Sequence, residues 1–126
     1  MSFTVDVKEE DKGVFTAYCQ GSLDTTTYSE FEKEINSLLR ENVKVVILNM
    51  EKVSYISSMG VSSILEAKRR FEEEGIVFIL LDLQPQVKKV FDIIKAFPVQ
   101  TIFTSVEELD GYLKSIQDKY KEEDKN

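Results

Sequence analysis

The sequence predicts one α/β domain, with a mostly parallel central sheet, an antiparallel N-terminal hairpin strand and four helices. Strand-like segments, which are short and either apolar throughout or alternately apolar and polar, alternate along the chain with helix-like segments. In the helix-like segments apolar residues recur every three or four positions. This alternation favours parallel strands joined by right-handed helical crossovers. The length of 126 residues suits one domain, and no repeat or linker divides the chain.

The first part of the chain predicts a hairpin and a helix. Residues 3–7 alternate apolar and polar side chains, and residues 14–20 form a second strand-like run. The turn at residues 11–13 lies between them, so the two runs are expected to pair antiparallel. Residues 21–24 end the hairpin. A helix is then predicted, with its apolar face formed by Phe31, Ile35, Leu38 and Leu39.

The middle of the chain predicts two buried strands around an amphipathic helix. Residues 43–49 are apolar with little alternation, which favours a central strand covered on both faces. Residues 50–57 are expected to form a connection, longer than the roughly 2–6 residues usual between a strand and a helix. Ser57-Ser58 opens a helix that closes at residues 72–75, and residues 76–81 form the second buried strand.

The last part of the chain predicts two helices and a short strand. Pro85 suits the first turn of one helix, and residues 101–103 read as the strand that follows it. Ser105 and Glu108 match a capping box that opens the last helix. We expect the domain to cover residues 1–120 and residues 121–126 to form a charged, frayed tail.

Composition excludes several classes of function. The net charge of −7, from 23 acidic and 16 basic residues, disfavours a nucleic-acid partner, because the phosphate backbone would be repelled. No apolar run approaches the roughly 20 residues of a membrane-spanning helix, and no signal peptide is recognisable. We therefore expect a cytoplasmic protein without membrane insertion. The lone Cys19, in a strand, is interpreted as a buried small hydrophobe.

No catalytic or metal-binding pattern is present in the sequence. The chain contains no histidine and one cysteine, which removes histidine-based catalysis and the usual zinc sites. Gly60 has no second glycine nearby to form a phosphate loop. Asn49 and Met50 stand where a phosphoryl-accepting receiver domain would carry its aspartate. We predict no enzyme activity, no catalytic residue, no metal site and no cofactor.

The remaining candidate site is the serine pair at the start of the predicted helix. Serine is a preferred helix N-cap, because its hydroxyl accepts a hydrogen bond from an N–H group of the first turn. A hydroxyl in this place also suits a phosphate, since the N–H groups and the helix dipole favour negative charge. On the residues alone, Ser57 and Ser58 are caps or a phosphorylation site.

Three motifs resemble the signature of STAS domains, and in particular of the bacterial anti-sigma-factor antagonists. The first is the apolar strand of residues 45–49 followed by residues 53–61, VSYISSMGV, and the second is residues 21–24, GSLD. The third is residues 84–91, QPQVKKVF, and the resemblance extends to about Tyr112. In the family pattern an aspartate precedes the serine that is phosphorylated. Here Ser57 stands at the position of that aspartate, and Met59 precedes the motif glycine.

The resemblance implies a STAS-like fold and a partner-switching regulator. Such antagonists bind an anti-sigma factor that is a serine kinase of the histidine-kinase-like ATPase fold, and a metal-dependent serine phosphatase removes the phosphate that the kinase adds. The matching phosphoacceptor is Ser58, with Ser57 as a lesser candidate. The expected partner-binding residues are Asp24, Ser57, Ser58, Met59, Gly60, Ser62 and Ser63. The alternative, favoured by the serine at position 57, is a scaffold that binds a partner constitutively without phosphorylation.

Overall fold

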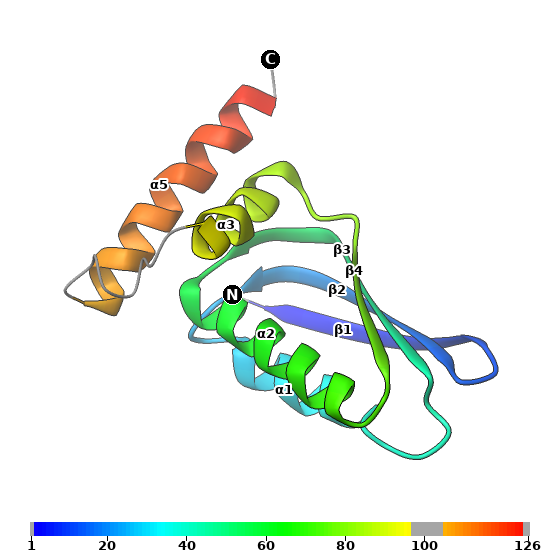
Figure 1. The fold of residues 1–126 in the computed structure, drawn as a ribbon. Helices are drawn as coiled ribbons and strands as arrows, with labels where there is room; N and C mark the ends of the chain where they lie inside the picture. The colour runs from blue at the N-terminus through cyan, green and yellow to red at the C-terminus, as the bar shows by residue number, and fades with distance from the viewer. Residues whose placement is uncertain (1, 97–104, 125–126) are drawn as a thin grey trace.

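A computed structural model describes residues 2–96 and 105–124, which form an α/β fold of alternating strands and helices (Figure 1). The predicted strand at residues 101–103 lies outside the described residues. The elements are β1 (Phe3–Asp11), β2 (Val14–Leu23), α1 (Tyr28–Asn36), β3 (Val45–Ile56), α2 (Ser58–Glu73), β4 (Val77–Leu81), α3 (Pro85–Ala96) and α5 (Val106–Asp124).

The strands of the described residues form one mixed sheet in the order β1-β2-β3-β4. β1 pairs antiparallel with β2, whereas β2 with β3 and β3 with β4 pair parallel. Four helices accompany this sheet in the described parts of the chain. The predicted fold class is therefore confirmed, including the antiparallel N-terminal strand.

The predicted connection at residues 50–57 is wrong, because β3 continues to Ile56. The end of β2 extends past Gln20 and pairs with this part of β3, from Gln20 opposite Lys52 to Leu23 opposite Ile56. Two irregularities in the register each place one extra residue on β3. Such bulges interrupt the apolar pattern with polar residues, here Glu51 and Lys52, and this interruption reads as a loop in the sequence.

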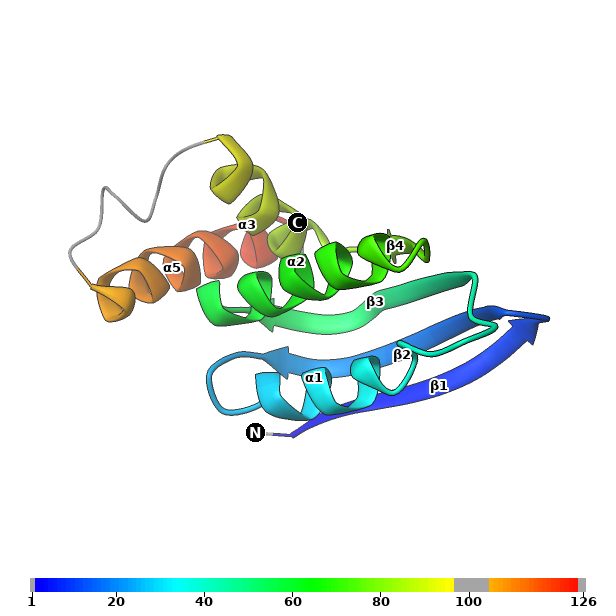
Figure 2. The same cartoon turned by 60° about the horizontal axis from the view of Figure 1, so that its bottom comes forward.

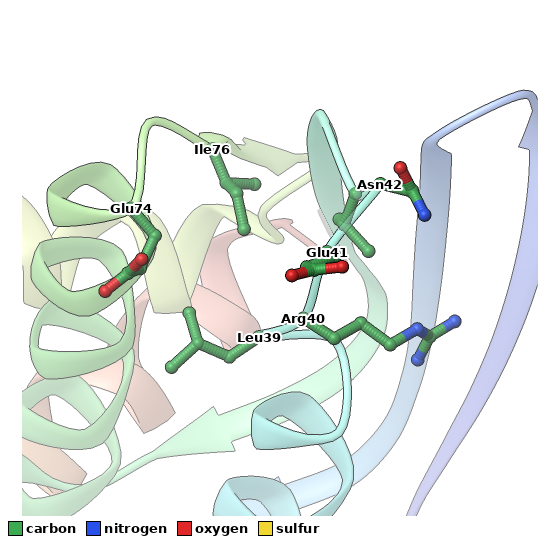
Figure 3. A pocket seen from close by; sticks show the side chains of 7 residues that line it. Leu39, Arg40, Glu41, Asn42, Glu74 and Ile76 are labelled. Carbon is green, nitrogen blue, oxygen red and sulfur yellow. The ribbon is translucent and has the colours of Figure 1, made fainter.

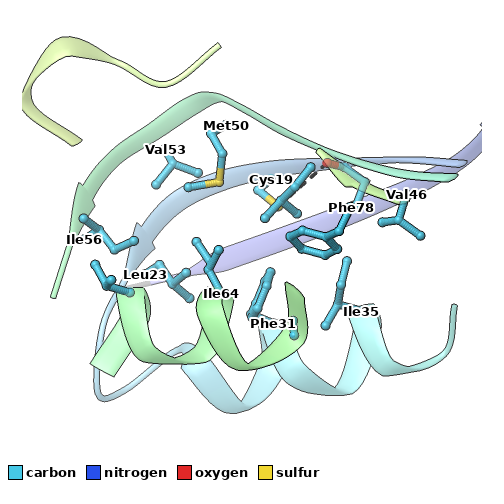
Figure 4. Packing of buried hydrophobic residues seen from close by; sticks show 14 of the residues in the cluster. Cys19, Leu23, Phe31, Ile35, Val46, Met50, Val53, Ile56, Ile64 and Phe78 are labelled. Atoms are coloured by element: carbon cyan, nitrogen blue, oxygen red, sulfur yellow. Dashed lines mark hydrogen bonds between the residues drawn. The ribbon is translucent and has the colours of Figure 1, made fainter. Parts of the chain in front are cut away.

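The hydrophobic core lies between one face of the sheet and the helices α1 and α2 (Figures 2 and 4). Phe31 and Ile35 of α1 and Ile64 of α2 are fully buried there against the sheet. Cys19 is buried among them, and burial raises the pKa of its thiol to about 12. A thiol with such a pKa stays protonated, as expected of a residue that acts as a small hydrophobe.

The other face of the sheet is partly open at its β4 side. Val77 and Ile79 of β4 are 53% and 40% exposed, and burial along β3 alternates from Val45 to Met50. The expectations that residues 43–49 are covered on both faces and that residues 76–81 form a second buried strand are therefore wrong. The apolar character of residues 43–49 arises because half-buried Val45 and Ile47 alternate with Val46 and Leu48, which are fully buried on the core side.

The helices α3 and α5 pack against each other at the end of the sheet where β3 finishes (Figures 1 and 2). Val87 and Val90 of α3 and Leu113 of α5 are fully buried in this second layer. α5 continues to Asp124, past Lys121 at which we expected the charged tail to begin. This arrangement brings the middle of α5 to the start of α2.

Candidate functional site

The candidate site lies at the carboxyl edge of the sheet, where β2 and β3 end side by side. Leu23 is the last residue of β2 and pairs with Ile56, the last residue of β3. The Ser57 N–H donates a 2.9 Å hydrogen bond to the Leu23 carbonyl oxygen. Because the carboxyl ends of parallel strands are the usual location of functional sites in such sheets, the serine pair has the position that a site requires.

Ser57 is the N-cap residue of α2. Its backbone is extended, and its Oγ accepts a hydrogen bond from the Gly60 N–H at 3.2 Å. Its carbonyl oxygen accepts the first helical bond, from the Val61 N–H at 3.0 Å. The residue is only 2% exposed. The cap interpretation is confirmed for Ser57, and its hydroxyl is directed into the structure.

Ser58 is the first residue of α2 and is half-buried, so its side chain is more accessible than that of Ser57. Met59 is 37% exposed and Ser62 is exposed on the same helix. Ser63 is buried at 4% exposure. On α2, the accessible part of the predicted partner-binding set is therefore Ser58, Met59 and Ser62.

Gly60 allows the first turn of α2 to lie directly against the end of β2. A Cβ atom at this position would lie 2.5 Å from the Leu23 carbonyl oxygen and 2.8 Å from Cγ1 of Ile56. Both distances are shorter than any ordinary contact of a methyl group. The glycine is required here for close approach, and it fixes the start of α2 relative to both strand ends.

Asp24 lies at the same edge, in the turn between β2 and α1. Its Oδ1 accepts hydrogen bonds from the Thr26 N–H at 2.9 Å and the Thr26 hydroxyl at 2.7 Å. Partial burial would raise the pKa of Asp24, but the hydrogen bonds from Thr26 and Thr27 outweigh this effect and lower it. Asp24 is thus an ionised turn residue, half-buried at the border of the site.

α5 contributes two polar residues to the site that the sequence did not indicate. The Asp110 Oδ1 accepts a hydrogen bond from the Ser58 N–H at 2.9 Å. The Gln117 Oε1 accepts from the Ile56 N–H at 2.9 Å, and its Nε2 donates to the Ile56 carbonyl oxygen at 2.8 Å. Gln117 is 2% exposed, which is unusual for a glutamine. Its place in the apolar stripe of α5, four residues after Leu113, was a signal in the sequence.

Three carboxylates and one ammonium group lie close to Tyr55 at the site. Tyr55, next to the end of β3, has a raised pKa because it is partly buried and because Asp110, Asp24 and Asp118 lie nearby. Lys114 opposes this shift, but its ammonium group is paired with Asp118 at 2.8 Å. A phosphate on Ser58 would therefore enter a region in which carboxylates outnumber cations.

Two hollows border the sheet at opposite ends. One, of about 410 Å³, lies beside the site and is lined by Ser22, Tyr55 and Gln117, among others. The other, of about 470 Å³, lies between Arg40, Asn42 and Glu74 at the amino ends of β3 and β4 (Figure 3). Neither hollow includes Ser58 in its lining.

Within the part of the chain that the structure describes, no three His, Cys, Asp or Glu side chains form a group that could hold a metal ion. No helix among residues 2–96 and 105–124 combines the length and the apolar character needed to cross a membrane.

The chain belongs to the STAS domain family, whose model matches residues 7–109. The family predicted from the three motifs is therefore confirmed. Among curated proteins, the chain is similar to the "Putative anti-sigma factor antagonist BtrV" of Bordetella bronchiseptica. The two are 27% identical over 90 residues, which cover 69% of this chain and 78% of BtrV.

Solved structures share the fold. The phosphorylated form of the Bacillus cell fate determinant SpoIIAA superposes with a TM-score of 0.60 at 24% identity, over 71% of this chain and 81% of that chain. The STAS fold also occurs within longer proteins, such as the murine anion transporter Slc26a9, with a TM-score of 0.62 at 19% identity over 73% of this chain. The chain spans only 16% of Slc26a9 and 20% of a matched Mglu chain.

Proposed function

We propose that the chain is a regulator of the anti-sigma factor antagonist type, which binds a protein partner at the site around Ser58 and loses that partner when Ser58 is phosphorylated. The contrast between two neighbouring serines carries the proposal. The Ser57 hydroxyl is buried and used as a cap, whereas Ser58 is accessible at the start of the same helix. The similarity to BtrV supports the antagonist class.

The proposed partner is an anti-sigma factor that is also a serine kinase of the histidine-kinase-like ATPase fold. The Ser58 Oγ forms a bond to the γ-phosphorus of ATP while the bond from that phosphorus to ADP breaks, and a base of the kinase takes the hydroxyl proton. A metal-dependent serine phosphatase adds water to the phosphorus and releases inorganic phosphate. In this proposal the switch works in the cytoplasm, and the chain itself catalyses neither step.

The proposed binding surface consists of Ser58, Met59 and Ser62 on α2, with Asp24 at its border. Ser57, Gly60 and Ser63 are buried below this surface and contribute indirectly, because they set the position of the first turns of α2. A phosphate adds a charge of about −1.5 to −2 at neutral pH. In a packed interface this charge would have to be desolvated, which weakens binding. A net loss of about 1–3 kcal/mol of binding free energy, the usual size of such a coupling, corresponds to a roughly 5- to 150-fold loss of affinity.

A pair of charge variants tests the proposal. We expect Ser58→Asp to bind the kinase roughly 5- to 150-fold more weakly, measured by titration calorimetry, while its circular dichroism stays native. Ser115→Asp is the matched control, because it adds the same charge at an exposed serine of α5 and should bind like the native chain. Unfolding of Ser58→Asp would instead indicate that Ser58 has a structural role only.

The second candidate function is a constitutive scaffold, and the buried serine at position 57 favours it. The Ser57 hydroxyl is committed to the Gly60 N–H and cannot supply the carboxylate of the family pattern. A scaffold would bind its partner equally well as the native chain and as Ser58→Asp. Equal recovery of the same partners by both proteins in a pull-down would support the scaffold over the switch.

A further inference from the structure

Asp110 places a carboxylate from α5 in direct contact with the residue that we propose to be phosphorylated. Its Oδ1 accepts the Ser58 N–H at 2.9 Å, although the two residues are 52 positions apart in the sequence. A carboxylate is favoured at a helix N-terminus, because unpaired N–H groups and the helix dipole attract negative charge. The Asp110 carboxylate therefore occupies the position that a phosphate on Ser58 would also favour.

The same contact is one of a small number that hold α5 against the end of β3. Gln117 makes two hydrogen bonds with the backbone of Ile56, and Leu109 and Leu113 are buried on the same side of the helix. Asp110 and Gln117 are seven residues apart, so they share a face of α5. α5 is thus held by its packing against α3 and, at the end of β3, by polar contacts with the two residues on either side of Ser57.

Charges around this contact would make a second anion unfavourable. Asp24, Asp110 and Asp118 each raise the pKa of Tyr55, which lies between the strand end and α5. Lys114 is the cation that acts on the same phenol, and it is already paired with Asp118. A phosphate and the Asp110 carboxylate would compete for the same N–H groups and would repel each other in this field.

We propose that Asp110 couples the state of Ser58 to the docking of α5. A phosphate on Ser58 displaces the Asp110 carboxylate from the start of α2, and the loss of this contact loosens α5 from the end of β3. Asp110 is a positioning residue in this proposal, since it acts on the partner surface through α5. The inference rests on the proposed phosphorylation of Ser58, but the coupling is a separate property of the chain.

Hydrogen exchange on chains that carry phosphoserine at position 58 tests the coupling. The phosphoserine is introduced during synthesis, so the experiment does not depend on a kinase. We expect the phosphate to accelerate deuterium uptake roughly fivefold to thirtyfold at the amides of α5 and at the Ile56 amide, which Gln117 protects. Among the described residues, no hydrogen bond joins α1 to Asp110. The amides of α1 should therefore exchange at an unchanged rate, and they serve as the internal reference.

Asp110→Asn is the matched variant, because its amide oxygen can still accept the Ser58 N–H but carries no charge. We expect the phosphate to accelerate α5 exchange clearly less in this variant than in the native chain. A purely structural role of Asp110 would give the same acceleration in both. The coupling is overturned by an acceleration below roughly fivefold in the native chain, or by an equal acceleration in Asp110→Asn. Neither result bears on whether a kinase modifies Ser58, so the two proposals can fail separately.

Discussion

The adjacent residues Ser57 and Ser58 carry the same side chain, but their hydrogen bonds and their burial differ. Ser57 is outside the helix and buried, with its hydroxyl bonded to the Gly60 N–H. Ser58 is inside the helix and half-buried, and its backbone N–H is bonded to Asp110. At this scale the structure assigns the cap to Ser57, and the Ser58 hydroxyl is the one that we propose to be phosphorylated.

The capping role of Ser57 predicts a loss of stability on truncation. Ser57→Ala removes the acceptor of the Gly60 N–H, so we expect the free energy of unfolding to fall by about 1 kcal/mol. Ser62→Ala is the control, because Ser62 is an exposed residue of the same helix and its truncation should cost less than about 0.5 kcal/mol. Urea denaturation measures both. Equal effects would mean that the cap contributes nothing specific.

The hydrogen bonds of Asp24 predict a contribution to acid sensitivity. The pKa of Asp24 is lowered in the folded chain from its ordinary value of 3.8. The ionised form therefore stabilises the fold above a pH of about 4, and this stabilisation disappears as the pH falls through the lower folded pKa. We expect native chain to lose stability more steeply than Asp24→Asn between about pH 4 and pH 2. Parallel urea curves across this range measure the difference, and superimposable pH profiles would contradict the assignment.

At the scale of elements, the site is formed where four segments meet: the ends of β2 and β3, the start of α2 and the middle of α5. β2 and β3 are held together by their parallel ladder, and α2 is held by Ser57 and by the close approach at Gly60. α5 is joined through Asp110 and Gln117. Hydrogen bonds to backbone groups on both sides of Ser58 join these segments, so its position is well defined.

The close approach at Gly60 predicts a large cost for a single methyl group. Gly60→Ala would bring a Cβ within 2.5 Å of the Leu23 carbonyl oxygen, so we expect destabilisation by about 1–3 kcal/mol or more. Gly111→Ala is the matched control, since no atom lies within 4 Å of its added Cβ on α5. Alanine favours a helix over glycine, so this control should gain up to about 1 kcal/mol. Thermal unfolding of the two variants checks the contrast, and an unchanged midpoint for Gly60→Ala would refute the packing argument.

The order of elements and the serine pair could be predicted because both depend on local patterns. Helical spacing, strand alternation and the capping serine are determined by neighbouring residues. The length of β3 was missed because polar Glu51 and Lys52, at the first of two bulges in the strand, interrupt its apolar pattern. The contacts of Asp110 and Gln117 join residues more than fifty positions apart. A single sequence contains no signal for such a distance, apart from the buried glutamine in an apolar stripe.

At the scale of the whole molecule, the chain is a STAS domain with its accessible serine at the carboxyl edge of the sheet. The core between the sheet and the helices α1 and α2 lies behind this edge, and α3 with α5 forms a second layer beside it (Figure 2). A charge added at Ser58 would therefore affect a partner at the surface and α5 at the same time. Ser58 is not part of the hydrophobic core, so the added charge would not be placed within the core.

The most direct test of the central proposal is a map of phosphate transfer to the intact chain. The native chain, Ser58→Ala and Ser57→Ala are each incubated with MgATP and the purified serine kinases of the histidine-kinase-like fold encoded in the same genome. Mass spectrometry of the intact proteins then counts the added phosphates. We predict a single phosphate on the native chain, none on Ser58→Ala, and continued transfer to Ser57→Ala. A phosphate that persists in Ser58→Ala, or the absence of transfer by every kinase, would contradict the proposal.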